Sequence, residues 1–133
     1  MATIQDIITA ALRRINAVGV AEVPSADESA DALDYLNDYM AEWPGKDWDV
    51  LDSLGNAYTH TPLSLTDTWP LDDKFLGSIK AILAARLAER YGSPVTQELR
   101  FAESRGVNML AAAFHPGIRP DMPSLLKNVD YWY

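Results

Sequence analysis

Apolar side chains recur every three or four residues in four separate segments of this 133-residue chain, which is the spacing of one helix face. Proline and glycine punctuate the stretches between those segments. We therefore expect an all-α fold, a four-helix bundle-like domain with one core, over residues 1–115. The expected helices span residues 4–18, 26–43, 73–91 and 94–114.

Short polar side chains mark where the first two helices begin. Thr3 is placed as an N-cap, with Asp6 as an acid in the first turn. Ser25 and Glu28 have the spacing of a capping box, in which each side chain accepts a hydrogen bond from the other residue's backbone amide. Both helix starts are therefore encoded locally.

Glycine and proline mark where helices end. Gly19 is expected to stop the first helix, and Pro44 the second. Between the last two helices, Gly92 suits a left-handed position, Ser93 an N-cap and Pro94 a first helical position. So short a joint predicts an antiparallel pair of helices.

The second helix has two distinct faces. Its predicted buried stripe is Ala30, Leu33, Leu36, Met40 and Trp43. Its acidic face, expected to meet water or a partner, is Asp27, Asp31, Asp34 and Asp38. The fourth helix has a weaker stripe of Val95, Leu99, Ala102, Met109, Leu110 and Ala113.

Residues 44–71 form an irregular arm between the second and third helices. Tyr58–Thr66 alternates enough for one or two short strands, but Pro62 interrupts it, so we expect either a small hairpin or an ordered extended loop. Long irregular stretches in compact domains often have a function. Two interpretations of the arm stay open here: a loop that covers the core, and a loop that contacts a partner.

Residues 116–133 combine prolines and a glycine, which break regular structure, with many apolar and aromatic side chains. Pro116, Pro120 and Pro123 prevent a long helix, yet the segment is far more apolar and aromatic than a disordered tail. It is expected to be an extended docking arm, either folded back on its own domain or lying on another chain. Its candidate partner-binding residues are Ile118, Arg119, Met122, Leu125, Leu126, Tyr131, Trp132 and Tyr133.

Charge is unevenly spread along the chain, whose net charge is −8. Residues 1–73 hold 14 acidic and 3 basic residues, and residues 74–133 hold 5 acidic and 8 basic residues. The two halves attract each other, either within one molecule or head to tail between neighbours. Simple solvation of surface charge explains the pattern equally well. Nonspecific binding to nucleic acid is disfavoured, since it requires a dominant basic face.

The sequence contains little that predicts catalysis. There is no cysteine, and His60 and His115 lack ligand-spaced partners, so no catalytic, cofactor or metal site is expected. No stretch approaches the ~18–20 apolar residues of a membrane span, and no secretion signal is recognisable. An acid pair such as Glu42 with Asp47, Asp49 or Asp52 beside tryptophans would suit a glycosidase. Chance proximity of acids is the stronger explanation.

The order of these pieces resembles a known family. Residues 10–16 (AALRRIN), 22–25 (EVPS) and 32–43 (ALDYLNDYMAEW), then residues 83–88 (LAARLA) and 119–123 (RPDMP), are similar to the head-to-tail adaptors, or tail accessory factors, of tailed bacteriophages. The likeness is to the adaptors that stabilise packaged DNA in short-tailed phages. It covers most of the chain.

The resemblance implies a virion structural protein that is not an enzyme. About twelve copies would form a ring beneath the portal protein, extend the DNA channel, retain the genome and receive the next tail component, a nozzle or tail-tube protein. DNA would pass without specific binding, and assembly would take place in the host cytoplasm. The C-terminal arm would reach along the portal.

Two roles for the charged residues follow from such a ring. Asp27, Asp31, Asp34 and Asp38 would either line the channel and repel phosphates or pair with Arg100 and Arg105 of a neighbouring copy. Two other functions stay open: a peptidoglycan hydrolase associated with a phage tail, and a cytosolic helical interaction protein.

Overall fold

The computed structural model describes residues 2–16, 19 and 22–115. In those ranges the α-helices are α1 (Ile4–Arg14), α2 (Ala26–Ala41), α3 (Leu76–Arg90) and α4 (Gln97–Phe114). Two short 3₁₀ helices, η1 (Trp43–Lys46) and η2 (Asp73–Phe75), join them, and the described residues pair as β-structure in two isolated bridges alone. The all-α prediction is confirmed.

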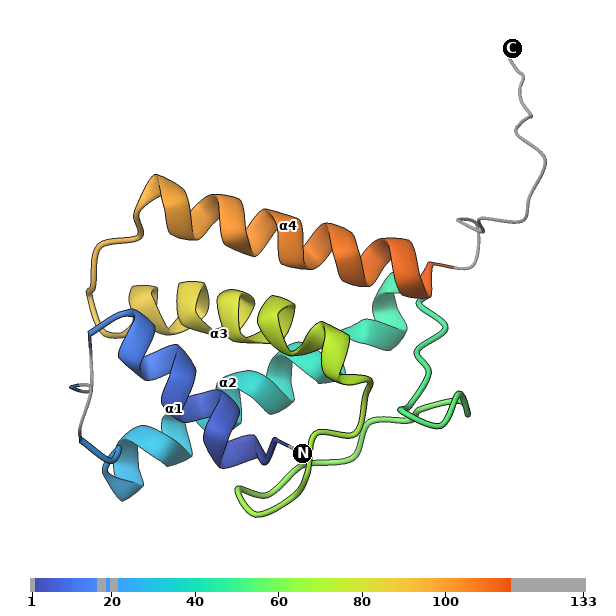
Figure 1. Cartoon of the computed structure of the whole chain (residues 1–133), viewed down its shortest axis with the longest axis horizontal. Helices are drawn as coiled ribbons and strands as arrows, with labels where there is room; N and C mark the ends of the chain where they lie inside the picture. The colour runs from blue at the N-terminus through green and yellow to red at the C-terminus, as the bar shows by residue number, and fades with distance from the viewer. Residues whose placement is uncertain (1, 17–18, 20–21, 116–133) are drawn as a thin grey trace, which may run out of the picture.

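α3 is the central helix, because α1, α2 and α4 all pack against it. Figure 1 shows α4 on one side of α3, with α1 and α2 on the other. α4 runs antiparallel to α3, as predicted. The middle of α3 is apolar on nearly every side, which suits a helix in the interior of a domain. Its buried residues include Ile79, Ile82, Leu83, Ala84, Ala85, Leu87 and Ala88.

Both predicted helix starts are confirmed. The Ser25 hydroxyl accepts from the Glu28 amide at 3.1 Å, and the Glu28 carboxylate accepts from the Ser25 amide at 2.8 Å. Thr3 and Asp6 make the same reciprocal pair, at 3.2 and 3.1 Å. The hydrogen bonds from Thr3 lower the pKa of the Asp6 carboxyl, because they favour its charged form.

The predicted end of the first helix, at Val18, is wrong. α1 ends at Arg14, and Asn16 adopts a left-handed conformation with φ of 61°. The Asn16 amide donates to the Arg13 carbonyl at 3.1 Å, which closes the last turn. Asparagine tolerates this conformation better than most residues, so it ends the helix before Gly19 is reached.

Pro44 does not stop the second helix abruptly. α2 ends at Ala41, and the chain continues through η1, with Pro44 in the first turn of that 3₁₀ helix. Proline is tolerated there because a first-turn amide needs no partner within the helix. The turn ends at Asp47, which has a left-handed φ of 57°.

The buried face of α2 is rotated from the predicted one. Leu36, Met40 and Trp43 are buried as expected, whereas Ala30 is exposed and Leu33 is half-buried. Ser29, Ala32 and Tyr39 take the remaining buried positions. The packing of α2 against both α1 and α3 sets this face, and the spacing of apolar residues along α2 does not reveal it.

The loop between α3 and α4 is longer than predicted. Gly92 is left-handed, with φ of 69°, as expected. The N-cap of α4, however, is Thr96, whose hydroxyl accepts from the Leu99 amide at 3.1 Å, so the predicted roles of Ser93 and Pro94 are wrong. The extra residues allow Val95 to pack against the core before α4 begins.

The irregular arm, residues 44–71, covers the core. Trp69 and Leu71 are each 1% exposed, and the Asn37 side chain binds both backbone groups of Leu63, at 2.9 and 3.2 Å. Of the two forms expected for residues 58–66, the hairpin is absent from the described arm, and the segment is a loop without strands. A tight turn forms earlier, where the Asp52 carboxylate accepts from two amides and Leu51 bridges to Ala57.

Candidate interaction surfaces

The predicted docking arm, residues 116–133, lies outside the described residues, together with all eight of its candidate partner-binding side chains. The structure does show where the described chain ends. The Phe114 ring lies 6.4 Å from both the Trp43 and the Trp48 ring, and the Phe114 carbonyl accepts from the Asp49 amide at 2.7 Å. The end of α4 is therefore anchored to η1 and the start of the arm.

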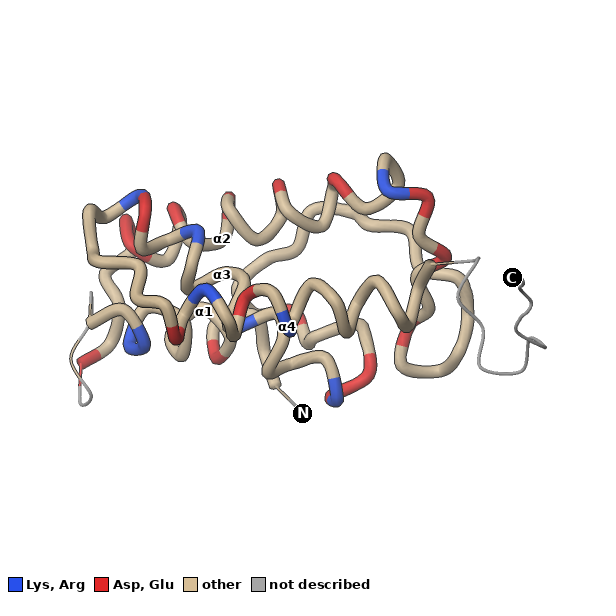
Figure 2. Tube along the Cα trace, turned by 90° about the horizontal axis from the view of Figure 1, so that it is seen from above, with Lys and Arg blue, Asp and Glu red and all other residues tan. Residues whose placement is uncertain are grey.

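The acidic face of α2 lies on the surface, as predicted. Asp27, Asp34 and Asp38 are exposed, and Asp31 is half-buried. Figure 2 shows the acidic residues of α2 in a row along one edge of the molecule. We call Asp27, Asp31, Asp34 and Asp38 the acidic edge.

One member of the acidic edge has a partner within the chain. Asp31 pairs with Arg90 of α3 at 3.7 Å. Asp27, Asp34 and Asp38 form no ion pair with any described residue. Most of the acidic edge is thus available to another molecule.

The two arginines predicted to meet those aspartates have different surroundings. Arg100 already pairs with Glu89 and Glu103, each at 3.1 Å, and these carboxylates raise the pKa of its guanidinium. Arg105 is exposed and has no ion pair among the described residues. Arg105 is therefore the better placed of the two to bind a neighbouring copy.

Glu42, the acid considered for a hydrolase, lies at the seam between α2 and α3. Its carboxylate is 3.4 Å from the guanidinium of Arg86, which also lies 4.7 Å above the Tyr39 ring. Asp52, one of its considered partners, holds the turn of the arm. These contacts give both acids a structural role.

A groove of about 420 Å³ lies between η1 and the arm. Its aromatic walls include Trp43, Trp48 and Tyr58, and the Tyr58 hydroxyl lies 3.1 Å from Nδ1 of His60. Burial lowers the pKa of the His60 imidazole. The Nε1 donor of Trp43 is buried without a hydrogen-bond partner among the described residues.

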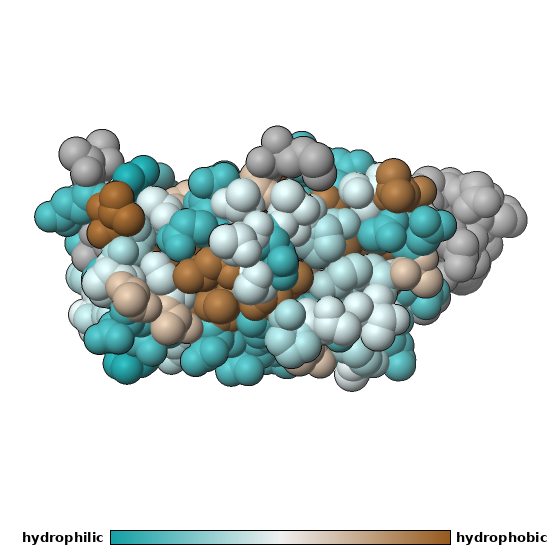
Figure 3. Space-filling model, turned by 90° about the horizontal axis from the view of Figure 1, so that it is seen from below, coloured by the Kyte–Doolittle hydropathy of each residue, from teal (hydrophilic) through white to brown (hydrophobic). Residues whose placement is uncertain are grey.

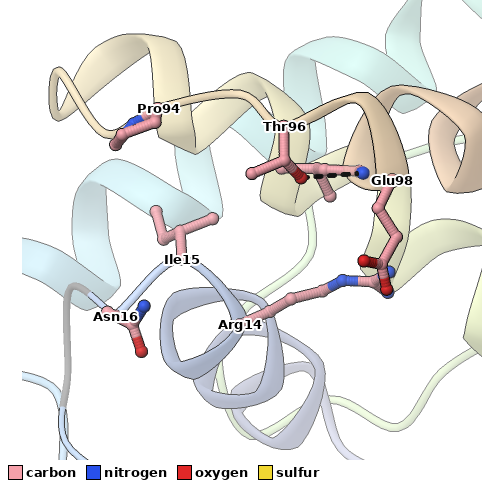
Figure 4. Close-up of a pocket in the computed structure, with 7 residues that line it drawn as sticks. Arg14, Ile15, Asn16, Pro94, Thr96 and Glu98 are labelled. Carbon is pink, nitrogen blue, oxygen red and sulfur yellow. Dashed lines mark hydrogen bonds between the residues drawn. The ribbon is translucent and has the colours of Figure 1, made fainter.

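A second cavity, of about 350 Å³, separates the end of α1 from the start of α4. Figure 4 shows Ile15 and Asn16 below Pro94 and Thr96, with Arg14 extending beneath the start of α4 in the direction of Glu98. No ion pair joins Arg14 to Glu98. The cavity therefore has apolar residues in its lining together with two charged side chains, Arg14 and Glu98, that form no ion pair in the described chain.

A third, shallow groove of about 390 Å³ runs over α1, α3 and α4. We call it the basic groove, and it is lined by Arg14, Gly77, Ser78, Ala81, Ala102, Arg105, Gly106 and Met109. At its base a side chain on Gly106 would approach the Ser78 carbonyl oxygen to 3.0 Å, so α3 and α4 are nearly in backbone contact. A glycine in the middle of a helix is therefore a signal of a close crossing, and Gly106 was not among the residues singled out from the sequence.

Exposed large apolar side chains are few on the described surface. Met109, predicted to be buried, is 40% exposed beside the basic groove, and Phe101 on α4 is 55% exposed. On the face shown in Figure 3, brown hydrophobic residues surface in small groups among hydrophilic ones. Scattered exposure of this kind is normal for a protein surface.

No model of a protein family matches this chain, and no curated protein matches it. Within the described residues, no group of three or more histidines and acids is placed to hold a metal ion. No helix there has the length and apolarity required to cross a bilayer. The candidate surfaces are accordingly defined by the geometry of this molecule.

Proposed function

We propose that this protein is a head-to-tail adaptor of a tailed bacteriophage, a structural protein of the virion. About twelve copies form a ring beneath the portal protein, extend the DNA channel, help to retain the packaged genome and present a platform for the next tail component. The C-terminal segment, residues 116–133, binds the portal.

The observation that carries this proposal is the acidic edge. Asp27, Asp34 and Asp38 repeat along one helix without a partner in the described chain, and like charges four residues apart destabilise a helix. Carboxylates without a partner inside the monomer are available to a partner outside it. In a ring, such an edge either repels the phosphates of DNA in the channel or contacts the next copy.

The segments that resemble the adaptor family support the proposal, because two of them join in space. Residues 32–43 run along α2 to the first residue of η1, and residues 83–88 lie within α3. Glu42 of the first segment pairs with Arg86 of the second. The likeness therefore involves one structural unit, the seam between α2 and α3.

The test is binding to the portal protein encoded in the same genome. We expect the full-length protein to co-sediment with the portal, and removal of residues 128–133 to abolish this while leaving circular dichroism and thermal unfolding unchanged. A matched control, Leu54→Ala, changes an exposed apolar residue of the arm and should bind normally. Failure of the full-length protein to bind the portal would contradict the proposal.

A second assay distinguishes an adaptor from a tail-associated hydrolase. We expect purified protein to release no more peptidoglycan fragments than buffer does. Release by the wild type that disappears in Glu42→Gln would establish an enzyme instead.

A further inference from the structure

We propose that the basic groove of one copy receives the acidic edge of a second copy, so that copies associate head to tail. The inference rests on the proposed function, since it names the contact that builds the ring. It also decides between the two roles of the acidic edge, because residues that fill a neighbour's groove do not line the channel.

Both surfaces carry small side chains that would allow a close approach. Every exposed residue of α2 is an alanine or an aspartate: Ala26, Asp27, Ala30, Asp34, Asp38 and Ala41. A helix face of such short side chains has low relief and can approach another backbone closely. The basic groove has a matching floor of small residues, Gly77, Ala81, Ala102 and Gly106.

The charges of the two surfaces are also complementary. Arg14 and Arg105 stand at the basic groove without an ion pair in the described chain, whereas Arg86 and Arg90 each have one and Arg100 has two. Arg13 also has no ion pair there, but its guanidinium donates to the Glu22 carbonyl at 2.9 Å. Across a contact, those two free guanidinium groups would meet carboxylates that are equally free. Charge pairs of this kind select the partner and fix the register of an interface.

An apolar side chain lies where such a contact would exclude water. Met109 is 40% exposed at the basic groove, and its sulfur accepts from the Ser78 hydroxyl at 3.3 Å. A flexible thioether adapts to an incoming helix face. The groove therefore offers an apolar contact next to charged side chains, a combination found in protein interfaces.

The two surfaces differ, and this determines the symmetry of the assembly. The basic groove is built from α1, α3 and α4, and the acidic edge belongs to α2. A contact between unlike surfaces leaves one of each free at the ends of every oligomer. Repetition then closes into a ring when the rotation between copies permits it.

Complementary charge reversal tests the inference. Asp34→Arg/Asp38→Arg and Arg14→Asp/Arg105→Asp should each weaken self-association at low salt by about tenfold or more, measured by sedimentation over a concentration series. An equimolar mixture of the two double variants should associate again, because each basic surface then meets an acidic one. Asp49→Arg/Asp73→Arg, on exposed residues outside both surfaces, is the matched control and should associate like the wild type.

The absence of cysteine allows a second, covalent readout. Gly77→Cys has room for its side chain, because a Cβ there meets no atom within 4 Å, and Asp34 is exposed. Under oxidation the double variant Asp34→Cys/Gly77→Cys should form a ladder of dimers, trimers and larger species, whereas each single variant stops at dimers. Asp34→Cys/Leu54→Cys controls for random collision and should form no comparable ladder.

Several results would overturn the inference. These are a wild type that stays monomeric throughout the low-salt series, reversal variants that associate normally, or a mixture that fails to recover. Portal binding distinguishes this failure from that of the proposed function. If the reversal variants still form rings on the portal, the adaptor proposal stands and the assigned contact is wrong.

Discussion

Arginines on the two sides of the α3–α4 pair differ in whether they form ion pairs. On the side facing α2, Arg86 pairs with Glu42 and Arg90 with Asp31. On the side facing α1, Arg14 and Arg105 border a groove and have no ion pair in the described chain. The arginines of the first side are paired within the molecule. Those of the second side are available to bind another molecule.

The largest expected effect comes from filling the floor of the basic groove. Gly106→Leu should destabilise the protein by about 2–3 kcal/mol, because its Cβ would press on the Ser78 backbone at the closest crossing of α3 and α4. Chemical denaturation measures this. Gly77→Ala is the control on the same groove, and it should be neutral or stabilising by about 0.5 kcal/mol, since its Cβ meets nothing. Equal losses at both glycines would refute the close crossing.

Replacing one arginine on each side should change the free energy of unfolding by different amounts. Arg86→Met should cost about 1 kcal/mol, because it removes both the ion pair with Glu42 and the stacking on Tyr39. Arg105→Met should change the free energy of unfolding by less than about 0.5 kcal/mol. Thermal and denaturant unfolding of the two variants, side by side, test this. A larger loss for Arg105→Met would show that it already has a role within the monomer.

Within the acidic edge, two neutralising substitutions should have opposite signs. Asp31→Asn loses the pair with Arg90 and should destabilise by about 0.3 kcal/mol. Asp34→Asn relieves repulsion along α2 and should stabilise by a similar amount, about 0.3 kcal/mol. Raising the salt concentration should reduce both differences. Identical effects of the two substitutions would mean that the Asp31–Arg90 pair contributes nothing.

The smallest effect concerns the start of α1. Because hydrogen bonds from Thr3 lower the pKa of Asp6 in the folded state, its contribution to stability is present above the ordinary value of 3.8. It is lost as the pH falls through the lowered value. An NMR titration should place the Asp6 midpoint below that of a free aspartate, and Asp6→Asn should remove this part of the acid dependence. A midpoint at or above 3.8 would contradict the capping box.

Local signals in the sequence predicted much of this fold. The N-cap at Thr3, the capping box at Ser25 and the left-handed Gly92 depend on neighbouring residues alone, and all are present. Features that depend on packing were missed. α1 ends at a left-handed Asn16 and not at the predicted Gly19. α4 begins after Thr96 and not after the predicted Ser93.

The candidate surfaces likewise include features that the sequence predicted and features that it did not. Helical spacing placed the four aspartates on one face of α2 correctly. Spacing did not reveal which arginines are occupied, since Arg100 and Arg105 look alike in sequence but only Arg100 lies within reach of Glu89. Arg14 was missed altogether, because its place at the basic groove depends on how α1 packs against α3.

Electron cryomicroscopy of the full-length protein bound to its own portal tests the central claim most directly. We predict a closed ring beneath the portal in which the acidic edge of each copy lies in the basic groove of the next, with Arg14 and Arg105 beside Asp34 and Asp38. A ring in which those aspartates face an open channel, or a portal that carries no ring, would contradict the account.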